Sequence, residues 1–325
     1  MKAVMCKQWG TPDDLTVEDI ASPSPKAGEV RIKVHACGVN FMDTLMIAGQ
    51  YQLKPEFPFS PGAEVAGEVI ELGEGVSNYK IGDRVMGLVS YGGYAEEVTA
   101  PALTLIPIPD NMDYVTAASF PIAYGTSHIA LAHRGQLKAG ETLFVLGASG
   151  GVGLTAVEIG KLMGATVIAA ASTDEKLKLT TEYGADHTIN YSTESIRDRV
   201  KELTGGKGAD VIYDPVGGDA FDQSLRAINW EGRILSIGFA SGRIPEVPLN
   251  LTLVKNCSIV GVFWGAYARK DPSVLVNSLM TLMGWYAEGK LKPHVSATYP
   301  LAQASDALYA LIKRKSTGKV VITMT

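Results

Sequence analysis

A glycine-rich run near the middle of the chain is the stretch best suited to chemistry. The apolar residues 143–146 precede a small-x-Gly-x-x-Gly spacing, which Ala148, Gly150 and Gly153 provide. Such a spacing is typical of a turn that binds the pyrophosphate of a dinucleotide, because it lets the backbone approach the phosphates at a helix N-terminus. With 35 glycines in the chain, an ordinary tight turn is the alternative, but the position between an expected strand and an expected helix favours the dinucleotide site. The residues expected around the phosphates are Ala148, Ser149, Gly150, Gly151, Val152 and Gly153.

The end of the next expected strand, residues 166–171, indicates which dinucleotide is bound. A site that prefers NAD carries a carboxylate here to bind the ribose 2′-hydroxyl. This chain has Ser172 and Thr173 instead, with Lys176 one helical turn later. A hydroxyl and an ammonium can bind a 2′-phosphate, whereas a carboxylate repels it, so the sequence predicts NADPH.

Neighbouring residues bear on the same preference. Tyr191 ends the expected strand 187–191 and could add a hydroxyl to the phosphate pocket. Asp174 argues against a preference for NADPH, because a shift in register could place its carboxylate at the ribose. A simpler interpretation of Ser172 and Thr173 is that they only cap the following helix.

Ligands of parallel sheets gather at the carboxyl ends of the strands. After the expected strand 232–238, we expect the backbone of Gly238, Phe239 and Ala240 to bond the nicotinamide carboxamide. After the expected strand 257–263, Phe263 is expected to form a wall of the nicotinamide pocket, together with Trp264. Both aromatic residues could instead pack in the core or in a dimer, and for Trp264 we favour packing.

The elements that must position these residues divide the chain into three parts. Residues 1–123 show short alternating runs separated by glycine turns, which predicts a β-rich domain. Residues 124–264 alternate strand and helix patterns, which predicts an α/β domain with a doubly wound parallel sheet. Residues 265–325 begin with a helix at about 271–288, and their last strand has the composition of the first domain, so we expect this part to fold back onto it.

Composition argues against several kinds of partner. The net charge of −5 and the lack of a dense Lys/Arg run argue against nucleic acid. Three scattered cysteines suit a reducing compartment rather than a disulfide framework. No signal peptide or run of membrane length is visible, so we expect a cytoplasmic protein with no membrane partner.

This organisation resembles the medium-chain dehydrogenase/reductase superfamily over nearly the whole chain. The resemblance rests on the glycine-rich run and on five local motifs: Cys37–Asp43, Pro58–Gly67, Ile81–Val85, Gly92–Glu96 and Ala123–Ser127. Within the superfamily the chain is most similar to the zinc-free quinone oxidoreductase branch, which is related to zeta-crystallin. The resemblance implies a GroES-like fold for the β-rich domain. It also implies a homodimer, in which the apolar strand at 258–263 would pair with its copy because an exposed edge invites pairing.

Zinc-containing members of the superfamily hold a catalytic metal with residues that this chain lacks. Asn40 stands at the position of the catalytic cysteine, and Ala63 stands in the Gly-His-Glu motif at the position of the histidine. Zinc needs three or four soft or imidazole ligands, and the cysteines and histidines of this chain show no such spacing, so we expect no metal. The alternative is a zinc site built from residues that are far apart in the sequence. Without a Lewis acid, the favoured reaction is reduction of an acceptor that is already electrophilic.

The resemblance also points to residues of the substrate cleft. It implies that Asn40 donates its amide to a developing oxyanion, that Tyr51 donates a hydrogen bond or a proton, and that Asp43 orients them. The alternatives are that Asn40 only holds a turn and that Tyr51 is an aromatic lid. We expect Glu64 to hold the β-rich domain together.

Two more residues match the cofactor side of the family pattern. Thr126 matches a threonine beside the nicotinamide, the alternative being a helix cap. Lys319 belongs to a C-terminal motif near the cofactor cleft.

Three functions follow from these residues. The first is a reductase that uses NADPH to reduce a quinone or a similar small electrophile. The second reduces an α,β-unsaturated ketone or enoyl thioester by the same hydride step. The third is a crystallin-like or regulatory protein that binds NADPH without turnover.

Overall fold

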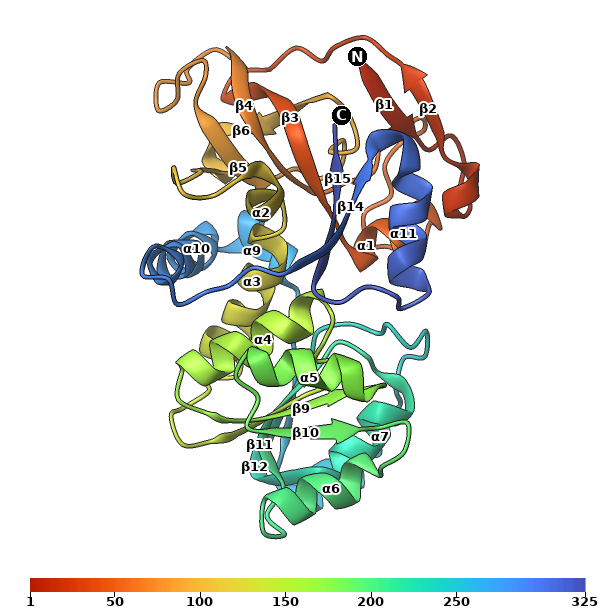
Figure 1. The fold of residues 1–325 in the computed structure, drawn as a ribbon, viewed down its shortest axis with the longest axis vertical. Coiled ribbons are helices and arrows are strands. Elements are labelled where there is room, and N and C mark those ends of the chain that lie inside the picture. Colours follow the sequence, from red (N-terminus) through yellow and green to blue (C-terminus); the bar gives the residue numbers. More distant parts are fainter. Residues whose placement is uncertain (325) are drawn as a thin grey trace. The chain divides into compact units, whose positions relative to one another are not determined.

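The computed structural model describes residues 1–324, which form two compact units (Figure 1). The β-rich unit comprises residues 1–122 and the C-terminal segment that begins at Pro293. The parallel-sheet unit comprises Ala123–Lys292. The chain passes from the first to the second within helix α3 (Pro121–His128). The predicted two-domain α/β fold is confirmed.

The β-rich unit is built on a mixed sheet with the strand order β14-β15-β3-β4-β5-β7, in which β6 also pairs with β3. A separate two-stranded sheet joins β1 and β2. The strands are β1 (Lys2–Met5), β2 (Thr16–Asp19), β3 (Glu29–Val39), β4 (Glu64–Leu72), β5 (Arg84–Leu88), β6 (Glu97–Pro101), β7 (Leu105–Pro107), β14 (Val295–Pro300) and β15 (Lys319–Thr323). The helices are α1 (Phe41–Ile47), α2 (Tyr114–Ala118) and α11 (Ala304–Ile312), with 3₁₀ turns η1 (Pro12–Asp14), η2 (Ala102–Thr104) and η5 (Leu301–Gln303).

Alternation along β3 makes the core of this unit. Val30, Ile32 and Val34 are each at most 2% exposed, since every second side chain of a strand points to the same face. Strand β15 pairs antiparallel with β3, with Val320 opposite Val39. The predicted return of the last strand to the first domain is therefore confirmed.

The parallel-sheet unit has six strands in the order β10-β9-β8-β11-β12-β13, and every adjacent pair is parallel. The strands are β8 (Thr142–Val145), β9 (Thr166–Ala171), β10 (His187–Asn190), β11 (Ala209–Asp214), β12 (Ile228–Ser236) and β13 (Ser258–Gly261). The helices are α4 (Gly151–Leu162), α5 (Asp174–Glu182), α6 (Ile196–Leu203), α7 (Gly218–Ala227), α8 (Leu249–Lys255), α9 (Tyr267–Lys270) and α10 (Pro272–Ala287), with a π-helical turn η3 (Ile129–Arg134) and a 3₁₀ turn η4 (Trp264–Ala266).

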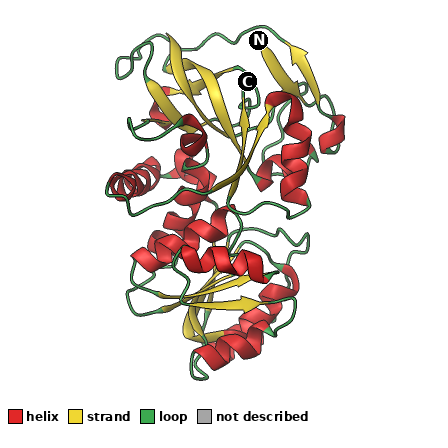
Figure 2. Ribbon diagram, viewed as in Figure 1, coloured by secondary structure: helices red, strands yellow, loops and turns green. Residues whose placement is uncertain are grey.

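Helices lie on both sides of this sheet, and Figure 2 shows the strands between them. Because both faces are covered, an interior strand can be apolar throughout. In β8 the consecutive residues Leu143, Phe144 and Val145 have no exposed surface, which explains the uninterrupted apolar run in the sequence.

The C-terminal return begins later than the sequence predicts. Residues 265–292, expected to belong with the return, are part of the parallel-sheet unit. Helix α10 is held there because Ser278 hydrogen bonds to Nδ1 of His128 at 2.8 Å and the ring of Trp285 packs edge-on against the His128 ring. An amphipathic pattern alone does not show which unit a helix covers.

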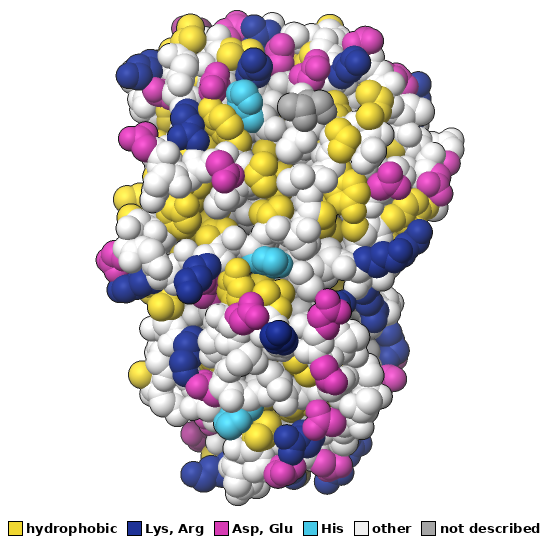
Figure 3. Space-filling view, in the orientation of Figure 1, with side chains coloured by type: hydrophobic (Ala, Val, Ile, Leu, Met, Phe, Trp, Pro, Cys, Tyr) yellow, Lys and Arg dark blue, Asp and Glu magenta, His cyan; other side chains and the backbone are white. Residues whose placement is uncertain are grey.

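Charged side chains of both signs are interspersed over the visible face, with no single basic patch (Figure 3). Among residues 1–324, no helix has the length and apolar character needed to cross a bilayer.

Candidate functional site

The glycine-rich turn between β8 and α4 has the shape that a pyrophosphate requires. An ideal Cβ on Gly153 would lie 2.2 Å from the carbonyl oxygen of Gly147, so any side chain there would push the helix off the turn. A Cβ on Gly150 would meet only that same oxygen, at 3.3 Å, which leaves open space beside the turn. No side chain among residues 1–324 caps the N-terminus of α4, so its first N–H groups can bind an anion. These residues fit a dinucleotide.

A buried cluster of three hydroxyls holds α3 against this turn. Ser127 Oγ lies 2.8 Å from Thr155 Oγ1 and 3.0 Å from the hydroxyl of Tyr213, and it donates to the carbonyl of Val152 at 2.8 Å. Its neighbour Thr126 is 7% exposed and lies inside α3 rather than at its N-terminus. The helix-cap interpretation of Thr126 is therefore wrong, and the cluster gives α3 a defined place beside the glycine-rich turn. Only the motif Ala123–Ser127 hinted at it in the sequence.

Ser172 and Tyr191 lie at the same edge of the sheet. Strands β9 and β10 are parallel with Ala171 opposite Asn190, so the next residue of each strand emerges side by side. The edge is held together by a hydrogen bond from Ser192 Oγ to the carbonyl of Ser172 at 2.8 Å. Two residues with hydroxyl side chains, distant in sequence, thereby follow neighbouring strands at one edge of the sheet.

The structure also bears on the two alternatives for this edge, namely that Ser172 and Thr173 only cap a helix and that Asp174 reaches the ribose. Thr173 caps α5, since its Oγ1 accepts from the N–H of Lys176 at 3.3 Å. Ser172 takes no part in that cap. The carboxylate of Asp174 accepts from the side-chain amide of Asn190 at 2.7 Å, which holds it against β10.

The other expected cofactor residues have more varied surroundings. The N–H groups of Gly238 and Ala240 donate to the carbonyls of Asp214 and Pro215, at 3.4 and 3.1 Å, so they shape the turn rather than offer free donors. Phe239 is 37% exposed. Phe263 is half exposed, whereas Trp264 is buried, and an ideal Cβ on Gly125 would lie 2.8 Å from its indole ring. For Trp264 packing is therefore the structural role.

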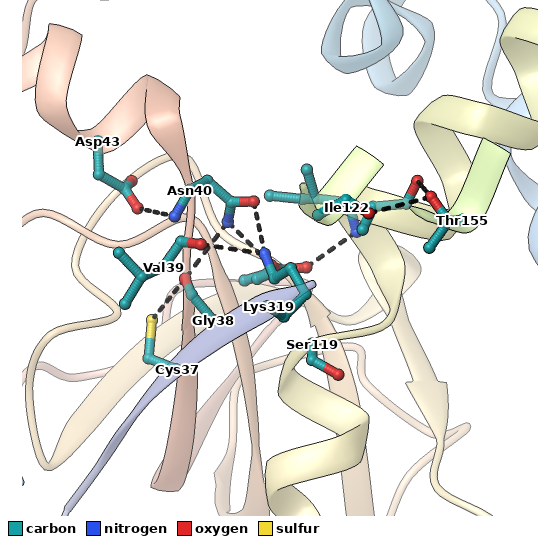
Figure 4. Close-up of polar contacts among 12 residues, drawn as sticks. Cys37, Gly38, Val39, Asn40, Asp43, Ser119, Ile122, Thr155 and Lys319 are labelled. Carbon is teal, nitrogen blue, oxygen red and sulfur yellow. Dashed lines mark hydrogen bonds and ion pairs between the residues drawn. The ribbon is translucent and has the colours of Figure 1, made fainter. Parts of the chain in front are cut away.

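A polar cluster in the β-rich unit surrounds Asn40, which directly precedes α1 (Figure 4). The Nδ2 group of Asn40 donates to Glu64 Oε1 at 2.8 Å and to the carbonyl of Gly38 at 3.3 Å. Its Oδ1 accepts from Lys319 Nζ at 2.7 Å. Both amide donors are already used, so Asn40 has none left for an oxyanion without breaking a bond.

Glu64 and Lys319 form a buried ion pair at the centre of this cluster. Lys319 Nζ lies 2.5 Å from Glu64 Oε1, and the two residues are 6% and 0% exposed. The ammonium also donates to the carbonyl of Val39 at 3.2 Å, and Glu64 Oε2 accepts from the N–H of Ile122 at 2.9 Å. All three N–H donors of Lys319 are thus used within the β-rich unit, so the expected cofactor contact finds no support in its surroundings.

Asp43 is a fully buried carboxylate on α1. Its Oδ2 accepts from the N–H of Asn40 at 2.8 Å and from the hydroxyl of Tyr94 at 2.9 Å, while its Oδ1 has no hydrogen-bond partner among residues 1–324. Burial raises the pKa of Asp43 to about 6, although these two bonds lower it. Tyr94 was not anticipated from the sequence.

Tyr51 is half-buried against the core of the β-rich unit. No hydrogen bond to its hydroxyl is found within residues 1–324. Burial, and then the charge of Asp43, raises the pKa of Tyr51, so the phenol keeps its proton at neutral pH. Of the three expected catalytic side chains, it is the one with an unused donor.

The raised pKa of Asp43 predicts a pH-dependent stability. Because the folded state binds this proton more tightly than the unfolded state, Asp43 makes the protein less stable as pH rises from about 4 to about 6. A pKa raised by about two units lowers the free energy of unfolding by roughly 3 kcal/mol once the pH is above both pKa values. Asp43→Asn, whose amide oxygen can still accept from Asn40 and Tyr94, is expected to remove this part of the dependence of the unfolding free energy on pH. Urea unfolding at several pH values checks this against Asp83→Asn, a change at a partly exposed carboxylate, and an unaltered pH dependence of unfolding in Asp43→Asn would contradict the assignment.

Two family models match the chain. The alcohol dehydrogenase GroES-like domain family covers residues 26–110, and the zinc-binding dehydrogenase family covers residues 151–280. These matches fall in the β-rich and parallel-sheet units respectively, as the sequence predicts.

Known proteins match along the whole length. A quinone oxidoreductase-like protein 2 homolog of Nematostella vectensis is 46% identical over 99% of this chain and 88% of its own length. The human quinone oxidoreductase is 35% identical over 100% of this chain and 98% of its own. The structure of Escherichia coli quinone oxidoreductase complexed with NADPH superimposes with a TM-score of 0.93 at 29% identity, covering 99% and 100% of the two chains. The chain therefore belongs to the zinc-free quinone oxidoreductase-like branch of the medium-chain dehydrogenase/reductase superfamily.

Proposed function

We propose that this oxidoreductase uses NADPH to reduce a quinone or a similar conjugated electrophile and needs no zinc ion. The observation that carries the proposal is the edge formed by Ser172 and Tyr191, which follow neighbouring parallel strands and where Asp174 is held by Asn190. The related E. coli enzyme, which is described as complexed with NADPH, supports the same cofactor.

The residues of the parallel-sheet unit have distinct tasks in this proposal. The turn from Ala148 to Gly153 binds the pyrophosphate through backbone N–H groups. Ser172, Lys176 and Tyr191 bind the 2′-phosphate. Thr126, which Ser127 anchors to α4, helps to orient the nicotinamide. NADPH supplies the hydride when bound, so the protein has mainly to orient the reactants and exclude water.

In the β-rich unit, the donor to the acceptor oxygen is Tyr51 rather than Asn40. The phenol is protonated and makes no hydrogen bond within the described residues, whereas both amide donors of Asn40 are used. A donor at the oxygen that gains charge stabilises the transition state. Asn40 and Asp43 then orient the segment that carries Tyr51.

The side chains around Asn40 do not suit zinc. Asn40 and Ala63 replace the two metal ligands of the zinc enzymes, and the neighbouring carboxylate of Glu64 is already paired with the ammonium of Lys319. Among residues 1–324, no group of three or more His, Cys, Asp or Glu side chains is arranged to hold a metal ion. This donor set supports a zinc-independent reaction.

Consumption of NADPH by chelator-treated protein tests the proposal. The panel contains quinones, enones and enoyl thioesters, with NADH in parallel. Turnover of quinones with NADPH, unchanged by added zinc, is the expected result. Saturating turnover on enoyl thioesters or enones alone would instead indicate a reductase of α,β-unsaturated carbonyl compounds, for which a protonated Tyr51 is equally suited. Tight NADPH binding without turnover on any acceptor would indicate a crystallin-like or regulatory protein.

The assembly we propose is a homodimer joined through β13. Within the part of the chain that the structure describes, this strand has a neighbour on one side only, and Ile259 on it is 36% exposed. Apolar side chains of α8 add to the exposed surface of the same unit, with Leu249 at 76% and Leu253 at 77%. Exposed edges invite pairing.

A single charge should disrupt this assembly. Ile259→Lys places like charges near the two-fold axis and is expected to give a monomer in sedimentation velocity, whereas Leu103→Lys, at an 89% exposed site of the β-rich unit, leaves the dimer intact. A dimer that persists in Ile259→Lys would refute the β13 interface. For location we propose the cytoplasm, which the three unpaired cysteines support.

A further inference from the structure

We propose that Lys319 is a positioning residue for the reduction, because its ammonium fixes the amide of Asn40 and thereby the segment that ends at Tyr51. The inference rests on the proposed function, since it gives Lys319 a purpose through Tyr51. It assigns Lys319 to the β-rich unit rather than to the cofactor.

The first step is the orientation of the Asn40 amide. Lys319 Nζ donates to Asn40 Oδ1 at 2.7 Å, and Glu64 Oε1 accepts from Asn40 Nδ2 at 2.8 Å. A flipped amide would place its NH₂ against the ammonium and its oxygen against the carboxylate. The ion pair therefore permits one orientation only, and the 3.2 Å bond from Nζ to the Val39 carbonyl holds the adjacent backbone as well (Figure 4).

The second step links Asn40 to Tyr51 through α1. The N–H of Asn40 donates to Oδ2 of Asp43 at the start of this helix. At the other end, the N–H groups of Gln50 and Tyr51 both donate to the carbonyl of Leu45, at 2.8 and 3.2 Å. The helix has only seven residues, so a change at its first turn is transmitted to the loop of Tyr51.

The third step separates this role from simple attachment of the last strand. Strand β15 already pairs with β3 along Val320–Thr323 and with β14 along Lys319–Thr323. Backbone pairing therefore holds the strand without the side chain of Lys319. The buried ammonium is better explained by the groups that it orients.

The experiment uses the full chain with three variants. Lys319→Met alone leaves Glu64 buried without a counter-charge and is expected to fold poorly, so the test variant is the double substitution K319M/E64Q, which removes both charges. Lys319→Arg keeps the charge, and Lys315→Met changes an exposed lysine of the same C-terminal segment. The measurements are kcat on a quinone, the Kd of NADPH from its fluorescence, and hydrogen exchange of the peptide 40–51.

The expected pattern in K319M/E64Q is a loss in kcat of roughly tenfold to a hundredfold with an unchanged Kd for NADPH. Exchange is expected to accelerate in residues 40–51, while Lys319→Arg recovers most of the activity and Lys315→Met behaves as wild type. Unchanged kcat or unchanged exchange in the double variant would overturn the proposal. So would loss of NADPH binding in parallel with general unfolding, which a merely structural pair produces. If the wild type reduces no acceptor, the proposed function fails, and the exchange data alone still decide whether Lys319 fixes this segment.

Discussion

Replacing Ser172 by aspartate is expected to reverse the cofactor preference from NADPH to NADH. Ser172 follows β9 directly and stands beside Tyr191, so a carboxylate there would face the 2′-phosphate in the proposed complex. Repulsion between such charges at about 4 Å costs on the order of 4 kcal/mol at an effective dielectric constant of about 20. Partial screening by solvent still leaves a loss of roughly a hundredfold in NADPH affinity. NADH should gain, because the new carboxylate can bind the ribose 2′-hydroxyl.

The control for this variant carries the same charge one residue later. Thr173→Asp keeps the helix cap, because aspartate also accepts from the N–H groups of a first turn. Its carboxylate is held at α5, so a much smaller loss of NADPH affinity is expected. The Kd of each cofactor and the ratio of kcat/KM values measure the effect. An unchanged ratio in Ser172→Asp, or an equal loss in both variants, would show that Ser172 does not face the phosphate.

Removing the hydroxyl of Tyr51 should lower kcat by about a hundredfold on enones, where a proton must be delivered, and by less on quinones. Phenylalanine keeps the packing of the ring against the core, so stability and NADPH affinity should stay close to wild type. The raised pKa of Tyr51 adds a second expectation. Since the phenol is protonated below its folded pKa, this group should cause no alkaline loss of activity until pH rises above about 10.

Tyr79→Phe is the matched control for this prediction. Tyr79 is also a partly buried tyrosine of the β-rich unit, and its hydroxyl donates to the carbonyl of Leu105 at 2.8 Å. Its loss should reduce stability by about 1 kcal/mol and leave kcat unchanged. Equal kcat values for Tyr51→Phe and wild type across the acceptor panel would assign Tyr51 to the lid instead.

Much of the candidate nucleotide site can be recognised from local sequence. Residues 143–146 are apolar, as a buried parallel strand requires. The glycines after them allow a tight turn and the close approach of a helix. The expected strand 166–171 agrees with β9 residue for residue. The family motifs identified the superfamily, since five short patterns in order are specific.

Other features depend on contacts between distant segments. Asn40 as a direct donor and Lys319 as a cofactor residue were reasonable expectations from motifs, but motifs do not show which donors are already used. The boundary at Pro293 likewise depends on a contact between α10 and α3. It is the hydrogen bond between Ser278 and His128, which are 150 residues apart in the sequence.

Residue types and their local order thus determine the fold class, the family and the glycine-rich turn, because those properties depend on neighbours in the chain. The pairing of Glu64 with Lys319, across 255 residues, is decided only when β15 returns to β3. That return places a cation beside a carboxylate in a buried site, and this determines the orientation of Asn40 and leaves Tyr51 as the remaining donor.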